Sequence, residues 1–343
     1  MLGAVMSALL LAGCGGSAAG NASQAGNTPP APPSSQSSTA GQSSAVKPVH
    51  IDIGQYVEHP SLDAAVAGFK DALKAAGYVE RETVFYNQKN AQGATDLTAS
   101  VAQSFAQDNA DLILAVATPM AQAVAKVVKD RPVLITAVTD PVSAGLVKSL
   151  DHPGGNVSGT TDLNPVAEQI GLIPQIKPGA KRVGILYNSG EANSLVQVKL
   201  ARQAAQQNGL TLVEATVTQA GEVAQAAQSL VGRVDAIYVP TDNTVVAALD
   251  AVIKVANQNK IPIVSGEGDS VKKGCVATYG IDYHQLGEQT GQMAVEILQG
   301  KAKPADLAIR GGEPQLILNQ AAAEAQGAVL PEKLLSKAKQ VYR

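Results

Sequence analysis

The feature that most constrains the fold of this chain is an alternation of short apolar runs with amphipathic segments. Residues 49–53 (VHIDI) have the pattern of a strand, and residues 62–76 follow with apolar side chains at helical spacing. Residues 111–116 form a continuous apolar run, which is typical of a strand buried on both faces of a parallel sheet. This alternation predicts strands joined by helices in a doubly wound parallel sheet.

The same pattern is repeated about 130 residues further along the chain. Residues 182–187 correspond to residues 49–53, residues 194–207 have the pattern of the next helix, and residues 235–239 correspond to residues 111–116. Such a repeat indicates a duplicated unit. We therefore predict an α/β fold of two similar doubly wound parallel-sheet lobes joined by a multi-strand hinge. A ligand cleft is expected between the lobes, because open parallel sheets bind ligands outside the carboxyl ends of their strands.

The chain is expected to cross between the two lobes three times, near Asp162, Ile281 and Gly311. A helical pattern at residues 285–298 then returns to one lobe, and an apolar strand at residues 315–318 returns to the other. These crossings predict residues 47–162 and 282–311 in the first lobe, and residues 163–281 and 312–343 in the second.

The first residues indicate export and anchoring. Residues 1–12 are apolar but too short to span a bilayer, and this segment leads into Leu11-Ala12-Gly13-Cys14. That ending resembles a bacterial lipobox, although no Lys or Arg precedes the apolar run. The resemblance implies that residues 1–14 are a lipoprotein signal peptide with its lipobox and that Cys14 carries the lipid.

The following segment, residues 15–46, is rich in Gly, Ser, Ala, Gln, Asn and Pro. Such a composition cannot bury enough apolar surface to offset the entropy of ordering, so a disordered tether of about 30 Å is expected. The folded part is therefore expected in the cell envelope, outside the cytoplasm and lipid-anchored to a membrane.

Composition excludes several classes of function. The formal net charge is −3 and Lys and Arg form no dense stripe, which argues against a nucleic-acid partner. Aromatic residues make up 3% of the chain and Trp is absent, which weakens a carbohydrate-binding interpretation. The four His residues are scattered, so no metal site is expected. Cys275 is expected to be a small buried apolar side chain rather than a disulfide partner of Cys14.

The chain also lacks the sequence signatures of common enzymes. It contains no G-x-S-x-G nucleophile motif, no G-x-x-x-x-G-K-[ST] loop and no G-x-G-x-x-G turn after a predicted strand. The segment His152-Pro153-Gly154-Gly155 is interpreted as a turn rather than an oxyanion-hole loop. We therefore predict that the protein is not an enzyme and needs no cofactor, with a lipid-anchored hydrolase as a distant alternative.

Polar side chains follow the predicted strands in both halves. Thr118 and Asp140 each precede a proline, as expected for a helix N-cap whose free backbone N–H groups attract a carboxylate. Ser189 and Asp242 follow strands of the second half. Hydroxyls, amides and carboxylates that converge from two lobes suit a small zwitterion. Each of these residues is equally well explained as a helix cap, and for His59 a structural role is the favoured interpretation.

Seven separated segments carry a resemblance to a known family. They are EHPSLD at 58–63, NAQG at 90–93, ATPMAQ at 117–122, VTDP at 138–141, PGGNVSG at 153–159, LYNS at 186–189 and DY at 282–283. In this order they resemble the tryptophan/tyrosine-type ABC transporter substrate-binding protein family, over nearly all of residues 49–335. The resemblance implies the type I periplasmic-binding-protein clamp, amino-acid ligands that are aromatic in some members, and an ABC permease with its ATPase as partners. It places the following residues around the ligand: Tyr56, Thr118, Thr139, Asp140, Ser189, Asn193, Asp242 and Asp282.

The expected function is that of a monomeric, extracytoplasmic substrate-binding lipoprotein of an ABC importer, which captures a small solute by hinge closure. A clamp that reports its ligand to a membrane receptor is the alternative from another class, because the same fold serves both. The identity of the ligand does not follow from the sequence.

Overall fold

The computed structural model describes residues 47–343. The predicted signal peptide, the lipidation site at Cys14 and the tether at residues 15–46 lie outside the described residues.

The first sheet contains six parallel strands in the order β11-β5-β4-β3-β1-β2. These strands are β1 (Val49–Gln55), β2 (Val84–Asn90), β3 (Leu112–Val116), β4 (Val133–Val138), β5 (Val157–Thr161) and β11 (Arg310–Gly311). Its helices are α1 (Pro60–Ala75), α2 (Thr95–Gln107), α3 (Thr118–Val127) and α10 (Tyr283–Leu298). We call this sheet with its four helices the first lobe.

The second sheet contains seven strands in the order β13-β12-β10-β9-β8-β6-β7. They are β6 (Arg182–Asn188), β7 (Thr211–Val217), β8 (Ala236–Val239), β9 (Ile263–Ser265), β10 (Ala277–Gly280), β12 (Gln315–Asn319) and β13 (Gln340–Tyr342). Among the described strands, β10 and β12 form the one antiparallel pair. The helices of this second lobe are α4 (Val166–Ile176), α5 (Ala192–Gln207), α6 (Val223–Ser229), α7 (Asn243–Ala247), α8 (Leu249–Asn259), α9 (Gly268–Lys273), α11 (Gln320–Gln326) and α12 (Glu332–Leu335).

Both lobes share one strand order, which confirms the predicted α/β fold with two similar parallel-sheet lobes. The order β2-β1-β3-β4-β5 in the first lobe matches β7-β6-β8-β9-β10 in the second. Because these strands are parallel, their carboxyl ends meet at one edge of each sheet, where ligands of such folds bind.

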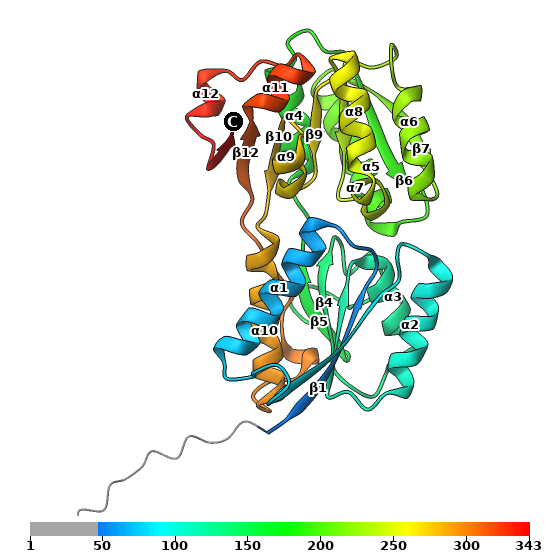
Figure 1. Cartoon of the computed structure of the whole chain (residues 1–343), viewed down its shortest axis with the longest axis vertical. Coiled ribbons are helices and arrows are strands. Elements are labelled where there is room, and N and C mark those ends of the chain that lie inside the picture. Colours follow the sequence, from blue (N-terminus) through cyan, green and yellow to red (C-terminus); the bar gives the residue numbers. More distant parts are fainter. Residues whose placement is uncertain (1–46) are drawn as a thin grey trace, which may run out of the picture. The chain divides into compact units, whose positions relative to one another are not determined.

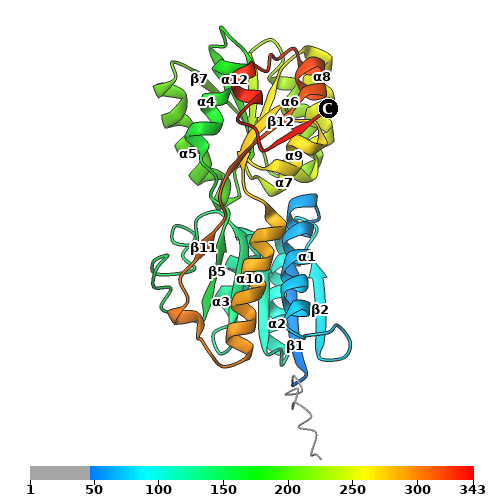
Figure 2. The same cartoon turned by 90° about the vertical axis from the view of Figure 1, so that its left-hand side faces the viewer.

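Helices cover both faces of the first sheet, which explains the continuous apolar run of β3. All five residues of β3 are buried. Helices α2 and α3 cover one face, and α1 and α10 cover the other (Figures 1 and 2). Gly287 lets α10 approach α1 closely, because a Cβ at this position would lie 2.0 Å from the Ala65 carbonyl oxygen. This contact holds α10, which comes late in the sequence, in the first lobe.

Three segments connect the two sheets: residues 162–165 between β5 and α4, residues 281–282 between β10 and α10, and residues 312–314 between β11 and β12. Figure 2 shows the last of these running from β11 to β12. Two of the segments carry an acidic residue, Asp162 in the first and Asp282 in the second.

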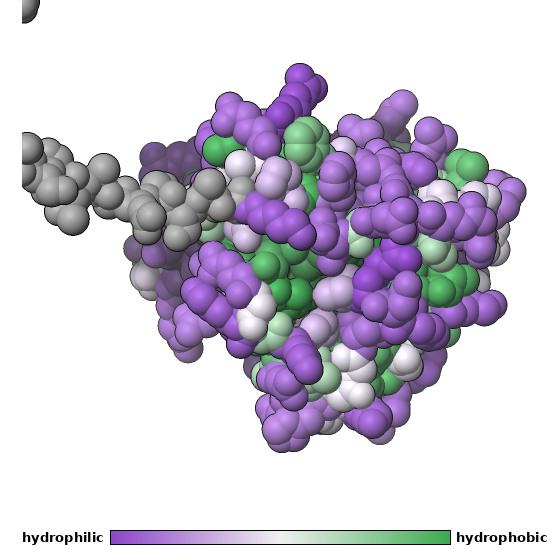
Figure 3. All heavy atoms as spheres, turned by 90° about the horizontal axis from the view of Figure 1, so that it is seen from below, coloured by the Kyte–Doolittle hydropathy of each residue, from purple (hydrophilic) through white to green (hydrophobic). Residues whose placement is uncertain are grey.

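The end of the first lobe seen in Figure 3 has a largely hydrophilic surface, with a smaller hydrophobic area near its centre. Over the part of the chain that the structure describes, no helix is both long and apolar enough to cross a membrane.

Candidate functional site

A small cavity lies between the carboxyl ends of the two sets of strands. It is nearly closed, with a volume of about 10 Å³, which is room for about one water molecule. It is lined by His59, Leu62, Ala137, Thr139, Asp162, Asn193, Thr241, Asp242, Asn243, Val246, Glu267 and Tyr283. The loops after β1, β4 and β5 supply one wall, and the loops after β6, β8 and β9 supply the other. The cavity therefore occupies the position that the strand directions predict.

Three lining residues have a buried polar atom without a hydrogen-bond partner among residues 47–343. The atoms are His59 Nδ1, Asp162 Oδ1 and Asn193 Oδ1. The three side chains are 8%, 4% and 3% exposed. Buried polar atoms are nearly always paired, so three unpaired atoms around one cavity indicate a place for a polar ligand.

Asp162 lies in the first connecting segment, and its second carboxylate oxygen is already occupied. Tyr283 Oη donates a hydrogen bond of 2.6 Å to Asp162 Oδ2. Burial raises the pKa of Asp162, and the hydrogen bond from Tyr283 opposes this shift. A cationic ligand group beside Oδ1 would offset the cost of burying this carboxylate.

His59 precedes Pro60, the first residue of α1. Burial lowers the pKa of His59 to about 4, and a hydrogen bond with Asn243 opposes the shift. His59 is therefore neutral near pH 7, and one of its ring nitrogens is an acceptor.

The wall contributed by the second lobe is a dense hydrogen-bond network centred on Glu191. Its carboxylate accepts from Asn193 Nδ2 at 3.0 Å and from the Asn243 backbone N–H at 3.1 Å. It also accepts from the Thr244 backbone N–H at 3.0 Å and the Thr244 hydroxyl at 2.7 Å. Glu191 thereby fixes the orientation of Asn193, whose Oδ1 remains for a ligand.

Asp242 is the second carboxylate of this network. It accepts from the Asn188 N–H and the Ser194 hydroxyl, both at 2.6 Å, and caps α7 by accepting from the Val245 N–H at 2.8 Å. Burial raises the pKa of Asp242 well above its ordinary value, and the neighbouring Glu191 adds to the shift.

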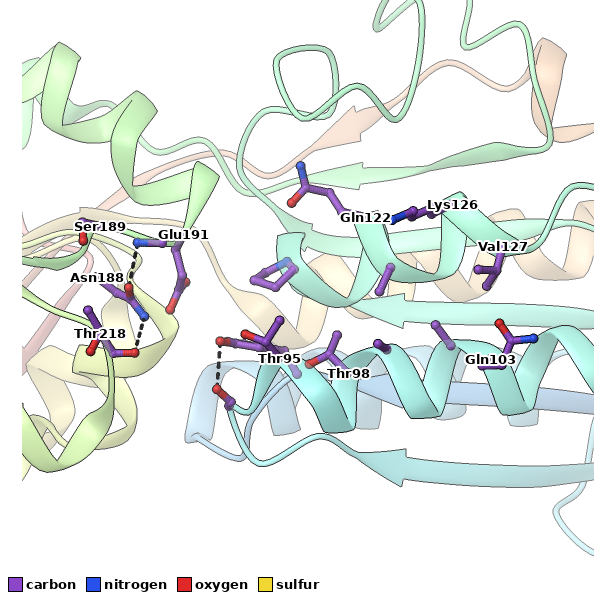
Figure 4. Close-up of a pocket in the computed structure, with 17 residues that line it drawn as sticks. Thr95, Thr98, Gln103, Gln122, Lys126, Val127, Asn188, Ser189, Glu191 and Thr218 are labelled. Atoms are coloured by element: carbon purple, nitrogen blue, oxygen red, sulfur yellow. Dashed lines mark hydrogen bonds between the residues drawn. The ribbon is translucent and has the colours of Figure 1, made fainter.

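A larger, more open cavity lies next to this network. It has a volume of about 630 Å³. Thr95, Thr98 and Gln103 of α2 face Gln122 and Lys126 of α3 along it, and residues 188–191 with Thr218 line its second-lobe side (Figure 4). Tyr56 also lines it and donates a hydrogen bond of 3.0 Å from its hydroxyl to the Gly93 carbonyl oxygen.

The structure divides the eight residues that the sequence suggested. Thr139, Asn193 and Asp242 line the small cavity, whereas Tyr56 and Ser189 line the larger one. Thr118 lines neither cavity, yet its buried hydroxyl has no partner within the described part of the chain. The remaining two residues are Asp140 and Asp282, which also line neither of these cavities.

Asp140 and Asp282 act as local caps. Asp140 accepts from the Val142 and Ser143 N–H groups at 3.1 and 3.0 Å, and Asp282 accepts from the Gln285 N–H at 3.1 Å. The prediction that Asp140 begins a helix is wrong, because residues 141–145 form turns. The helix predicted after Thr118 is present, but its N-cap is Ala117 and Thr118 is its first residue.

Sequence reasoning missed His59, Asp162, Glu191, Glu267 and Tyr283 as cavity or network residues. All five are buried and lie at or just beyond strand ends. Their positions near strand ends are visible in the sequence and could have identified them as candidates. Their burial could be seen only in the structure. In the described residues, no group of three or more His, Cys, Asp or Glu side chains could hold a metal ion. Cys275 is fully buried, as predicted.

The sequence comparisons agree with the fold and the cleft. The model of the ABC transporter substrate-binding protein family matches residues 50–342. This chain belongs to that family. A Clostridioides difficile relative named tyrosine-binding protein is 45% identical over 274 residues, which cover 80% of this chain and 79% of the relative. The family consists of binding proteins rather than enzymes, in agreement with the prediction from the missing catalytic motifs.

Two solved structures of substrate-binding proteins show the same type I periplasmic-binding-protein fold. A Streptococcus pneumoniae ABC domain in complex with L-Trp is 37% identical, with a TM-score of 0.83, and the match covers 86% of this chain and 100% of that one. A ligand-free, open substrate-binding protein with adhesive properties from Clostridium difficile is 43% identical. Its TM-score is 0.64, and the match covers 86% of this chain and 99% of that one.

Proposed function

We propose that this substrate-binding protein captures an aromatic amino acid in the small cavity and presents it to an ABC permease for import. The observation that carries the proposal is the convergence of three unpaired buried atoms from both lobes on that cavity. The relatives named for tyrosine binding and solved with L-Trp support the aromatic class.

The three unpaired atoms suit the ammonium group of an amino acid. A primary ammonium has three N–H donors and no acceptor. Asp162 Oδ1 and Asn193 Oδ1 are acceptors, and His59 Nδ1 is an acceptor in the tautomer whose other ring nitrogen carries the hydrogen. The lining contains the carboxylates of Asp162, Asp242 and Glu267 and no Lys or Arg, so a cationic group is favoured there.

The start of α3 is the proposed partner of the ligand's carboxylate. Helix α3 has ten residues and begins two residues after β3, at the sheet edge where the cavity lies. Its first residue, Thr118, is outside the cavity lining, and its buried hydroxyl has no partner in residues 47–343. Free N–H groups and the helix dipole favour an anion at such a terminus. The Thr139 hydroxyl lies 3.4 Å from that of Thr241 across the cleft and also interacts with Asp162.

The apolar part of the cavity lining suits the side chain of an amino acid. The cavity is nearly closed at about 10 Å³, so the lobes would have to part to admit the ligand and its walls would have to adjust around it. Leu62, Val246 and the ring of Tyr283 supply apolar contacts for a side chain. The chain has no Trp, so stacking on the ligand would come from Tyr283 or His59.

We further propose that the two lobes close about a hinge. One lobe comprises residues 47–162 and 282–311, and the other comprises residues 163–281 and 312–343. Only a ligand that contacts both lobes shifts the balance toward the closed form. The small cavity has walls from both lobes. The higher TM-score to the L-Trp complex than to the open structure, despite lower identity, supports a ligand-bound-like arrangement here.

The anchor and the cellular location are part of the same proposal. A lipid on Cys14 and a flexible tether at residues 15–46 would hold a monomeric clamp outside the cytoplasm within reach of its permease. Fractionation tests this, because Cys14→Ala should move the protein from the membrane to the soluble fraction. Retention of the variant in the membrane fraction would contradict a lipid anchor.

Calorimetric titration of the purified protein, unfolded and refolded to remove carried-over ligand, tests the ligand class. Tight one-to-one binding is expected for L-tyrosine or L-tryptophan, and weaker or no binding for Gly, Asp and Lys. Asp162→Asn should weaken binding strongly, whereas the matched Asp140→Asn should not. Binding of none of the amino acids would refute the proposal and leave the fold unaffected.

A further inference from the structure

A second contact across the cleft joins the lobes beside the small cavity. Ser61, in the first turn of α1, places its Oγ 2.9 Å from Glu267 Oε2 and 2.9 Å from Asp269 Oδ2. Ser61 belongs to the first lobe, and the two acidic residues lie at the start of α9 in the second. We call these three residues the clasp. Ser61 is fully buried and Glu267 is 2% exposed.

If both acids are ionised, the clasp has too few hydrogen atoms to form both of its hydrogen bonds. A serine hydroxyl has one hydrogen and donates to one carboxylate. The second carboxylate, also at hydrogen-bond distance, is then an acceptor facing the lone pairs of Ser61 Oγ. A proton on that carboxyl group turns it into a donor and satisfies both contacts.

Other donors near the clasp account for one negative charge. Glu267 accepts from the Ser270 N–H at 3.1 Å and from the Ser270 hydroxyl. The N-terminus of α1, a helix of 16 residues, also stabilises an anion beside Ser61. Two ionised carboxylates on one buried hydroxyl would leave the second charge uncompensated.

Nearby titratable groups do not supply a cation to the clasp. Lys273 is paired with Asp250 at 3.1 Å, and His59 is neutral near pH 7. Lys339 and His284 line a groove that also contains Asp269, but within residues 47–343 neither forms an ion pair with it. The other titratable groups around the clasp are Asp162, Cys275, Asp282, Tyr283 and Tyr342.

We propose that closure of the lobes takes up one proton, shared between Glu267 and Asp269 through Ser61, so that ligand affinity rises as the pH falls. Burial raises the pKa of Glu267, and the charge of Asp269 adds to the shift, in the closed arrangement. When the lobes separate, water reaches Glu267, and its pKa returns toward the ordinary value of a carboxyl group.

Linkage fixes the direction of the effect. Between the ordinary carboxylate pKa and the raised value of the closed form, closing binds up to one proton, so the closed form gains population as the pH falls. With one proton, the affinity changes at most about tenfold per pH unit. Asp162 acts in the opposite sense, because a bound ammonium group favours its ionised form and releases a proton. Variants of the clasp separate the two contributions.

Titration calorimetry with L-tyrosine and L-tryptophan, in two buffers of different ionisation enthalpy at pH 5.5 and pH 7, measures the protons taken up on binding. Glu267→Gln carries a permanent amide donor. On binding ligand, it should therefore take up fewer protons than the wild type does, with a difference of up to one proton. Its affinity should vary less with pH. The matched control Glu332→Gln, an exposed residue on α12, should behave as the wild type. Asp269→Asn provides a second variant in case Glu267→Gln does not fold. Unchanged proton uptake in both clasp variants would overturn the proposal.

This test uses the proposed ligands, and therefore rests on the proposed function. If neither amino acid binds, the proposed function fails, and the clasp is tested by small-angle scattering of the unliganded protein at pH 5 and pH 8. The wild type should have a smaller radius of gyration at pH 5, and Glu267→Gln should show little change. A wild type without a pH effect, or a variant with the same effect, would refute the shared proton.

Discussion

The two walls of the cleft differ in how completely their polar groups are paired. In the wall of the first lobe, His59 and Asp162 each have a buried polar atom without a partner in the described chain, and Thr118, at the same edge of the sheet but outside the cavity lining, has another. In the wall of the second lobe, Glu191 and Asp242 accept several hydrogen bonds each. The second wall is therefore paired without a ligand except at Asn193 Oδ1, whereas the first wall leaves more groups for the ligand to satisfy. Substitutions in the second wall should act mainly on stability, and those in the first mainly on affinity.

The largest effect is expected for Glu191→Ala. This change leaves the donors of Asn193, Asn243 and Thr244 unpaired in a buried region. Unpaired buried donors cost about 1–3 kcal/mol each, and water entering the vacated space would recover part of that cost. We expect the free energy of unfolding to fall by about 3 kcal/mol or more, measured by urea denaturation.

Glu222→Ala is a suitable control for this loss. Glu222 also accepts several hydrogen bonds, from Thr218 and Gln219, but it is only half-buried. It should cost well under 1 kcal/mol, because water replaces the lost acceptor. An equal loss in the two variants would show that the buried network is not what stabilises the second wall.

Asp162→Asn should have the next largest effect, and it should act on binding. The amide still accepts from Tyr283 Oη, but it lacks the charge proposed to hold the ligand's ammonium group. Hydrogen bonds to charged groups contribute about 1.5–3 kcal/mol, so the dissociation constant for the amino acid should rise roughly 10- to 100-fold. Calorimetry measures this change, and thermal unfolding without ligand should show little loss. A strong loss of stability with unchanged affinity would reverse the assignment of the two walls.

Much of the fold was predictable from periodicity, and the exceptions have a physical cause. Strand β3 is apolar throughout and was predicted nearly to the residue. Strand β5 was missed because its sequence is VSGTT. Its buried hydroxyls are paired instead. Ser158 Oγ donates a hydrogen bond of 2.7 Å to the Leu307 carbonyl oxygen, and Thr160 Oγ1 donates one of 3.1 Å to Thr136 Oγ1. Paired hydroxyls can fill a sheet interior without leaving an apolar pattern in the sequence.

The candidate site was less predictable, because pairing depends on tertiary contacts. The sequence placed Asp140 after a predicted strand, and it identified Asp162 only as a crossing between the lobes. In the structure, Asp140 caps a turn through the N–H groups of Val142 and Ser143, while Asp162 is buried at the cavity. Local spacing identified the right edge of the sheet but did not distinguish a capping carboxylate from one left for a ligand.

Asp52→Asn tests whether an incompletely paired acid of the first lobe affects stability when it does not line the cleft cavities. Asp52 lies within β1, is 1% exposed and accepts from Asn87 Nδ2 at 2.8 Å. Burial raises the pKa of Asp52 to about 6, Asp108 adds to the shift, and Asn87 opposes it. Because the folded pKa lies above the ordinary value, the ionised form costs stability above about pH 6, and this cost disappears as the pH falls toward 4.

The variant should therefore gain stability relative to the wild type as the pH rises from 4 to 8. Between pH 4 and pH 8 the difference in unfolding free energy should change by about 1–2 kcal/mol in favour of the variant, as measured by urea denaturation at a series of pH values. Ligand affinity should not change. A stability difference that is constant across this range would show that Asp52 does not titrate differently in the folded and unfolded protein.

Thr118→Val gives the smallest expected effect and the sharpest comparison of the walls. Valine replaces the buried, unpaired hydroxyl with a methyl group of similar size at the first residue of α3. Since no hydrogen bond within residues 47–343 is lost, the free energy of unfolding should fall by less than about 0.5 kcal/mol or should rise. The ligand's carboxylate would lose one donor, so the ligand affinity should fall severalfold, which corresponds to roughly 1 kcal/mol.

The matched control is Thr244→Val in the second wall. It removes a hydroxyl that donates a hydrogen bond of 2.7 Å to Glu191, and it should instead lower stability. If Thr118→Val lowers stability as much as Thr244→Val and leaves binding unchanged, the hydroxyl of Thr118 is a structural group and the first wall is not left open for a ligand.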